Sequence, residues 1–183
     1  MLRRIKCRGR KIMVHITKKD LDKDNFYKDS EINTTEEITC DENLGYIRFK
    51  KSIITTKSII LGLGSGIKAG DGIKAGWGIE AGWGIEAGDG IKAGWGIEAG
   101  LSIICKRVLK FSYQLFAGTC TWRKTTEGDL IIECGKLETD GKIVLGNLKE
   151  TGNIPEEIGK IKIIDGKKYR LVEDALNVKE VAE

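Results

Sequence analysis

Isoleucine recurs every six residues through the middle of this chain. Residues 66–101 are six unbroken copies of Gly-Ile-(Lys/Glu)-Ala-Gly-x, in which x is Asp, Trp or Leu. The isoleucine and the alanine of each copy are two positions apart, which places both side chains on one face of a β-strand. The two glycines per copy disfavour a helix and allow sharp bends between strands. The pattern predicts short strands and corners stacked in a β-solenoid.

The length of one solenoid turn follows from comparing the repeats with themselves. A shift of 12 residues matches 66–77 to 78–89 at 8 of 12 positions, whereas a shift of 18 matches 66–83 to 84–101 at 16 of 18. This favours a triangular turn of 18 residues with three strands, which stacks Asp71 on Asp89, and Trp77 on Trp95 and then Tyr113. Duplication of an 18-residue gene segment would produce the same match, which leaves a flat, two-sided helix as the alternative.

Aliphatic residues continue the six-residue ladder on both sides of the repeats. It starts at Ile47 and ends at Leu115, which gives twelve strands, or about four turns with Ile, Leu and Ala inside. Between Ile59 and Ile67 the step is eight residues instead of six, so a bulge or loop is expected there.

The whole chain is therefore expected to be all-β, a β-helix with an N-terminal cap and a C-terminal β-hairpin extension. We assign residues 1–35 to a basic arm and capping segment, 36–122 to the solenoid core and 123–183 to a C-terminal β-rich cap. Residues 36–50 are expected to close the first turn, and bulky residues before 123 to plug the last one. Asp165-Gly166 marks a hairpin turn between two β-rich runs.

Two further expectations concern the C-terminal part. Two strand-like runs flank Asp140-Gly141, which is expected to form the turn between them. Residues 172–183 are expected to form a short polar helix.

Three segments carry a resemblance to a known group of proteins: GWGIEAGWGIEAG, LFAGTCTWRK and ECGKLE. Over roughly residues 53–148 the chain resembles a family of small, poorly characterised hexapeptide-repeat β-solenoid proteins of low-GC bacteria and their phages or prophages. The resemblance implies the left-handed β-helix of bacterial hexapeptide-repeat proteins. Hexapeptide acyltransferases differ from this chain, because they place a small residue where it has Asp or Trp and use a histidine base that the repeats lack.

The net charge of +4 comes from the first residues of the chain. Beyond residue 11 there are 25 Lys and Arg against 27 Asp and Glu. A basic arm can bind phosphates, which would allow nucleic-acid contact. We favour two other interpretations, a solvated terminal segment or a segment that precedes a true start at Met13, because the rest of the chain offers no matching basic face. The arm contains six basic residues: Arg3, Arg4, Lys6, Arg8, Arg10 and Lys11.

Other features point away from an enzyme. The five cysteines are widely spaced, which supports neither a metal cluster nor a disulfide framework and fits reduced thiols in a cytoplasm. His15 is the only histidine and reads as a strand residue. The Asp20-Asp22-Asp24 run lacks the glycine and glutamate of a calcium loop. We expect no catalytic residues, cofactor or metal, no signal peptide and no membrane span.

The remaining signal lies on the exposed surface. The Lys and Glu of the repeats are expected to point outward as a charge-mixed surface, and the tryptophans to lie at the corners, where they either shield the backbone or bind a partner. We interpret the chain as a non-enzymatic interaction protein that binds a host protein or protein–nucleic-acid complex, for example an anti-CRISPR-like inhibitor. A self-assembling solenoid and a nucleic-acid binder are the alternatives, and a homo-oligomer is left open. The candidate partner-binding residues are Trp77, Trp83, Trp95, Tyr113 and Trp122.

Overall fold

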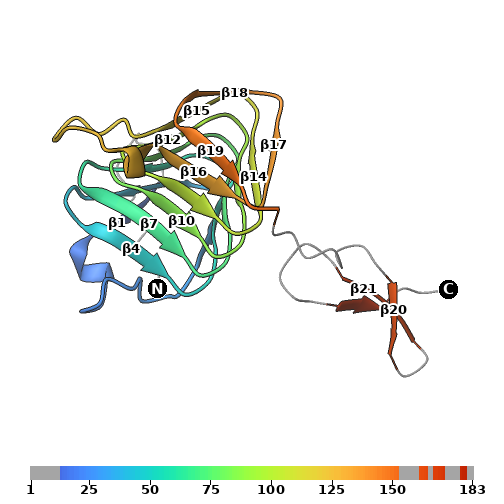
Figure 1. The fold of residues 1–183 in the computed structure, drawn as a ribbon. Helices are drawn as coiled ribbons and strands as arrows, with labels where there is room; N and C mark the ends of the chain where they lie inside the picture. The colour runs from blue at the N-terminus through green and yellow to red at the C-terminus, as the bar shows by residue number, and fades with distance from the viewer. Residues whose placement is uncertain (1–12, 153–160, 165–166, 172–177, 181–183) are drawn as a thin grey trace.

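The computed structural model describes residues 13–152, 161–164, 167–171 and 178–180. The described chain is all-β, with 51% of the described residues in strands and 5% helical, and three parallel sheets stack into a β-solenoid of about seven turns (Figure 1). The predicted fold class is confirmed. Because each turn contributes one strand to each of three sheets, the flat, two-sided alternative is wrong.

From β2 to β19, each sheet takes every third strand of the chain. Sheet I has seven strands: β1 (Met13–Ile16), β3 (Glu37–Cys40), β6 (Ile59–Leu61), β9 (Ile79–Ala81), β12 (Ile97–Ala99), β15 (Gln114–Ala117) and β18 (Lys142–Leu145). Sheet II has six: β4 (Gly45–Phe49), β7 (Ser65–Ala69), β10 (Ile85–Ala87), β13 (Ile103–Cys105), β16 (Ile131–Cys134) and β19 (Asn147–Glu150). Sheet III has six: β2 (Ile32–Thr34), β5 (Ile53–Thr55), β8 (Ile73–Ala75), β11 (Ile91–Ala93), β14 (Val108–Phe111) and β17 (Lys136–Thr139).

The strand register confirms the 18-residue turn. Ile85 pairs with Ile67 on one side and with Ile103 on the other. The corners stack in the same way, since the N–H of Trp95 donates to the carbonyl of Trp77 (3.1 Å) and the N–H of Tyr113 donates to that of Trp95 (3.0 Å). The predicted aromatic stack is therefore present.

The interior consists of aliphatic side chains stacked turn upon turn. All six repeat isoleucines are at most 2% exposed, and the repeat alanines are buried beside them. Glycine at the fifth repeat position brings successive turns close together. At Gly94 a Cβ atom would collide with the carbonyl oxygen of Gly76, one turn below. These glycines are thus required by the spacing between turns.

The eight-residue step between Ile59 and Ile67 forms the predicted loop. Gly64 adopts a left-handed conformation (φ 70°) in which a Cβ would collide with the side chain of Asn43. The buried hydroxyl of Ser65 accepts a hydrogen bond from the N–H of Leu44 (3.1 Å) and donates to the carbonyl of Asp41 (3.0 Å). The longer loop is therefore anchored to the turn below it.

The solenoid is longer than predicted. Its sheets run from β1 to β19, beyond the expected core of residues 36–122 and well beyond four turns. Residues 36–50 contribute β3 and β4 instead of a cap, and Phe111 is a buried core residue instead of a plug. Asp140-Gly141 is a corner between the parallel strands β17 and β18, each of which pairs with the turn below.

The segment between β1 and β2 covers the first turns. It contains the 3-10 helix η1 (Lys18–Asp20) and buries Leu21 and Tyr27, whose ring lies 5.2 Å from that of Phe49. A second excursion, between β15 and β16, contains the 3-10 helix η2 (Glu127–Leu130).

Beyond residue 160 the strands pair antiparallel. β20 (Ile161–Ile164) and β21 (Lys167–Leu171) form the predicted hairpin, since Ile164 pairs with Lys167. β22 (Val178–Glu180) adds a third strand against β21. The helix predicted for residues 172–183 is therefore wrong over 178–180, where backbone pairing with β21 outweighs local propensity.

Candidate partner-binding surface

The 18-residue turn sorts the outward-facing repeat residues into rows, one row for each sheet. Sheet I carries Ile60, Glu80, Glu98 and Phe116 in register. Sheet II carries Arg48, Lys68, Glu86, Ile104 and Glu133. Sheet III carries Ile54, Lys74, Lys92, Lys110 and Glu138, and Lys110 Nζ lies 4.0 Å from Glu138 Oε2. Within the repeats, the predicted charge-mixed surface is thus correct only for sheet II; there sheet I is acidic and sheet III is basic.

On sheet II neighbouring charges neutralise each other. Lys68 Nζ lies 2.8 Å from Glu86 Oε2 and also 4.3 Å from the ring centre of Tyr46. Near the C-terminal end, Lys149 Nζ lies 2.9 Å from Glu133 Oε2. Lysines and glutamates of this face therefore pair with each other.

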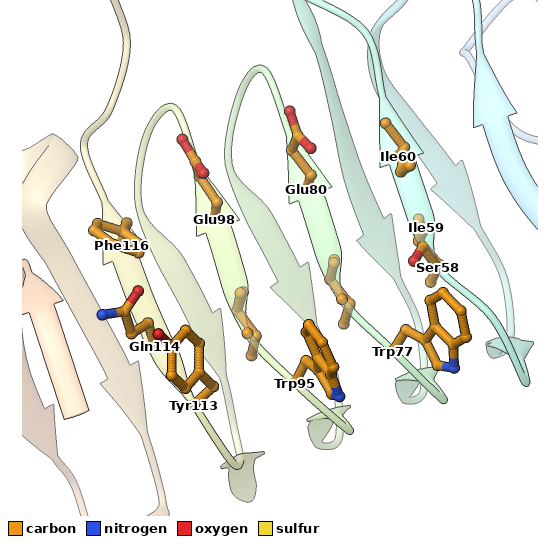
Figure 2. A pocket seen from close by; sticks show the side chains of 14 residues that line it. Ser58, Ile59, Ile60, Trp77, Glu80, Trp95, Glu98, Tyr113, Gln114 and Phe116 are labelled. Carbon is orange, nitrogen blue, oxygen red and sulfur yellow. The ribbon is translucent and has the colours of Figure 1, made fainter. Parts of the chain in front are cut away.

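Sheet I presents a row of aromatic side chains at the corner where its strands begin. Trp77, Trp95 and Tyr113 stand on three successive turns and are 61%, 70% and 62% exposed. Figure 2 shows them in line beside the row that contains Glu80 and Glu98. The two rows line a groove of about 310 Å³, in which the rings form one side and the carboxylates lie across from them.

A second groove of about 420 Å³ lies on the other side of the glutamate row. Leu63 and Trp122 line it from the corner where the strands of sheet I end, together with Glu42. Glu80 and Glu98 line both grooves, so the grooves meet along the glutamates. We call this surface, the two grooves on the outside of sheet I, the acidic face.

The structure divides the five predicted partner-binding residues between two surfaces. Trp77, Trp95, Tyr113 and Trp122 line the acidic face. Trp83 does not, because it lies in edge-to-face contact with Tyr46 at 5.5 Å on the side of sheet II and is only partly exposed.

Trp83 and Trp122 also fit the predicted shielding role. A Cβ on Gly45 would meet the indole of Trp83 at 3.9 Å, and a Cβ on Gly100 would meet the indole of Trp122 at 3.2 Å. These two indoles thus cover backbone that glycine leaves bare. By contrast, Trp77 and Trp95 turn most of their surface to solvent.

The other residues considered from the sequence lie in strands, in the segments between them, or outside the described part of the chain. The six basic residues of the predicted nucleic-acid arm lie outside the described residues. His15 is in β1, as expected, and its ring nitrogens lie 2.8 Å from Thr39 Oγ1 and 2.9 Å from Asp41 Oδ1. Asp22 accepts hydrogen bonds from the N–H groups of Asp24 and Phe26, so it stabilises a turn. Within the described part of the chain no group of acidic, His or Cys side chains is placed to hold a metal.

The described cysteines are free thiols buried in the fold: Cys40, Cys105, Cys120 and Cys134. Burial raises the pKa of Cys105 to about 12 and that of Cys134 to about 11. Because the thiolate is the reactive form, this burial lowers the reactivity of both thiols at neutral pH.

The sequence analysis placed Glu80 and Glu98 on the outer surface but missed that they form one acidic row, although the signal was present. Glu80 and Glu98 are 18 residues apart, as are Lys74, Lys92 and Lys110. Once the turn length is known, this spacing places like charges in one row. The position of Trp122 could not be predicted from the sequence, because Trp122 reaches the acidic face from the irregular segment after β15.

Comparisons with known proteins leave the surface as the main guide to function. Within the described residues no helix has the length and apolar character needed to cross a membrane. No protein-family model, curated protein or solved structure matches this chain.

Proposed function

We propose that this chain is a non-enzymatic interaction protein whose acidic face binds a macromolecular partner. The observation that carries the proposal is the row of three exposed aromatic rings on successive turns, Trp77, Trp95 and Tyr113. Large aromatic side chains left this open to solvent are unfavourable unless something covers them, and tryptophan and tyrosine are enriched where protein interfaces gain most of their energy. Hydrogen bonds between successive turns hold the backbone of these three residues in place, which reduces the ordering that binding requires.

Inhibition of a host system by a phage- or prophage-borne protein of this type stays a prediction. A rigid solenoid with one partner-binding face is suited to inhibition, because it can cover a surface of its partner without catalysing a reaction. The partner is a protein, or a protein–nucleic-acid complex reached through its protein component, since the carboxylates of the acidic face would repel phosphates.

The test is affinity capture of the tagged full-length chain from a host lysate, with and without nuclease. A stoichiometric protein should survive nuclease treatment, be lost in Trp77→Ser/Trp95→Ser, and be retained by Asp71→Ala. Asp71 makes a suitable control because it occupies the same repeat position at another corner. Capture of nucleic acid alone, or of a protein that both variants retain, would contradict the proposal.

Self-association is the second candidate, and one observation favours it. The last solenoid turn leaves apolar side chains of β18 and β19 exposed, namely Val144, Leu145 and Leu148. These strands are also the outermost of sheets I and II, and such edges can pair with another chain. Light scattering on the eluted protein distinguishes the two functions: a dimer that Leu148→Lys converts to a monomer supports end-to-end association, and a wild-type monomer rejects it.

A further inference from the structure

We infer that the acidic face binds an extended, arginine-rich segment of a partner protein, with guanidinium groups seated between its aromatic and glutamate rows. This inference rests on the proposed function and specifies the chemistry of the partner.

The first step is the uncompensated negative charge. Glu80 and Glu98 face each other in register on adjacent strands, and no ion pair or hydrogen bond to either exists among the described residues. Of the described residues that line the two grooves, none is Lys or Arg, while three are glutamates: Glu42, Glu80 and Glu98. Like charges directly opposite each other destabilise a sheet. A cation from a partner would remove this repulsion, whereas an anion would increase it.

The second step is the nature of the groove wall. The cation would lie against the exposed faces of Trp77 and Trp95, and tryptophan is the best aromatic partner for a cation. Ile60 and Phe116 lie at the two ends of the glutamate row (Figure 2) and offer an apolar surface for a side-chain stem. Arginine suits both requirements, because its planar guanidinium stacks on rings and binds carboxylates with two hydrogen bonds.

The third step is spacing. One ring and one outward residue appear in each turn, and neighbouring turns are about 4.8 Å apart. The row from Trp77 to Tyr113 therefore spans about 9.6 Å. In an extended peptide, side chains on one face are about 6.8 Å apart. Two arginines separated by one residue thus fit alongside three rings and two carboxylates.

The test is calorimetric titration of the full-length chain with a synthetic Ser-Arg-Ser-Arg-Ser peptide at low salt. The control peptide carries citrulline, which has the shape of arginine without its charge. We expect the arginine peptide to bind at least about tenfold more tightly, and Glu80→Gln/Glu98→Gln to abolish that difference. Lys74→Gln/Lys110→Gln, which changes charge on sheet III only, should leave binding unchanged.

Several results would overturn the inference. Equal binding of the two peptides would do so, as would full binding to Glu80→Gln/Glu98→Gln. Tighter binding of a neutral oligosaccharide than of the arginine peptide would assign the rings to sugar stacking instead.

The capture experiment separates failure of the inference from failure of the proposed function. A partner lost in Trp77→Ser/Trp95→Ser but kept in Glu80→Gln/Glu98→Gln leaves the proposed function intact and rejects the arginine-rich segment. A partner kept in both variants rejects the proposed function as well.

Discussion

Glu98 stacks on Glu80 in register on neighbouring parallel strands, whereas Glu86, at the same repeat position on sheet II, lies 2.8 Å from Lys68 Nζ. One sequence repeat thus produces a self-neutralised face and an unneutralised one on the same rod. The difference arises because a turn contains three copies, so residues 18 apart share a face and residues six apart do not.

Removing the stacked charges should stabilise the protein. We expect Glu80→Gln/Glu98→Gln to raise the free energy of unfolding by about 0.5 kcal/mol at low salt, and this gain to shrink in about 1 M salt as screening sets in. Glu86→Gln should instead lower it slightly, since Lys68 loses its partner. Urea unfolding at the two salt concentrations measures both effects. A loss of stability in the double variant at low salt would mean that the carboxylates are bonded.

The tryptophans should differ in their structural importance. Trp77→Ala/Trp95→Ala should change the free energy of unfolding by less than about 0.5 kcal/mol per residue, as expected for exposed side chains. Trp83→Ala should cost about 1–2 kcal/mol, because the indole packs on Tyr46 and covers Gly45. Denaturant unfolding of the variants measures this, and equal losses would refute the division into binding and shielding tryptophans.

Two glycines of the repeat should respond differently to alanine. Gly94→Ala should destabilise by about 1–3 kcal/mol, because the new methyl group collides with the carbonyl of Gly76. Gly78→Ala should be tolerated within about 0.5 kcal/mol, since its methyl group would lie 3.5 Å from the carbonyl of Gly96. Thermal unfolding of the two variants measures this difference. Close stacking of the turns predicts that Gly94→Ala is clearly less stable than Gly78→Ala, and equal stability of the two would contradict it.

An acid-sensitive ion pair anchors the excursion that carries Trp122. Asp129 accepts two hydrogen bonds from Arg123 (2.7 and 2.8 Å) and one from the N–H of Thr126 (2.7 Å), which together hold the pKa of its carboxyl well below the usual range. Because the folded state lowers this pKa, the stability it contributes is present above about pH 4 and is lost as the pH falls below that.

Asp129→Asn should therefore lower the free energy of unfolding by about 2 kcal/mol at pH 7. The gap between this variant and the wild type should narrow at pH 3. A gap that does not change with pH would show that the carboxylate charge does not contribute.

The repeats were sufficient to predict the core fold but not its extent. The spacing of Ile67, Ile85 and Ile103 gives the 18-residue turn directly, and the structure confirms it. The outer turns were missed because their strands keep the inward aliphatic residue but lose the hexad spacing: Leu109 pairs with Leu137, and Leu115 with Ile143. Parallel pairing depends on contacts far apart in sequence, which a local period cannot reveal once insertions interrupt it.

The candidate surface was predicted only in part for a similar reason. The 18-residue period predicts that Trp77 and Trp95 stack on one corner. It does not predict that Trp83 packs towards sheet II, because its contact there is Tyr46, which lies 37 residues earlier in the chain and two turns below.

The central claim is that the acidic face meets the partner, and site-specific photo-crosslinking in host cells tests it most directly. A photoreactive phenylalanine analogue would replace Trp95 in one variant and Lys110, on sheet III, in another. We predict that the Trp95 position yields a crosslinked protein of defined mass and that the Lys110 position does not. Crosslinks from Lys110 alone, or equal crosslinking from both positions, would contradict the claim.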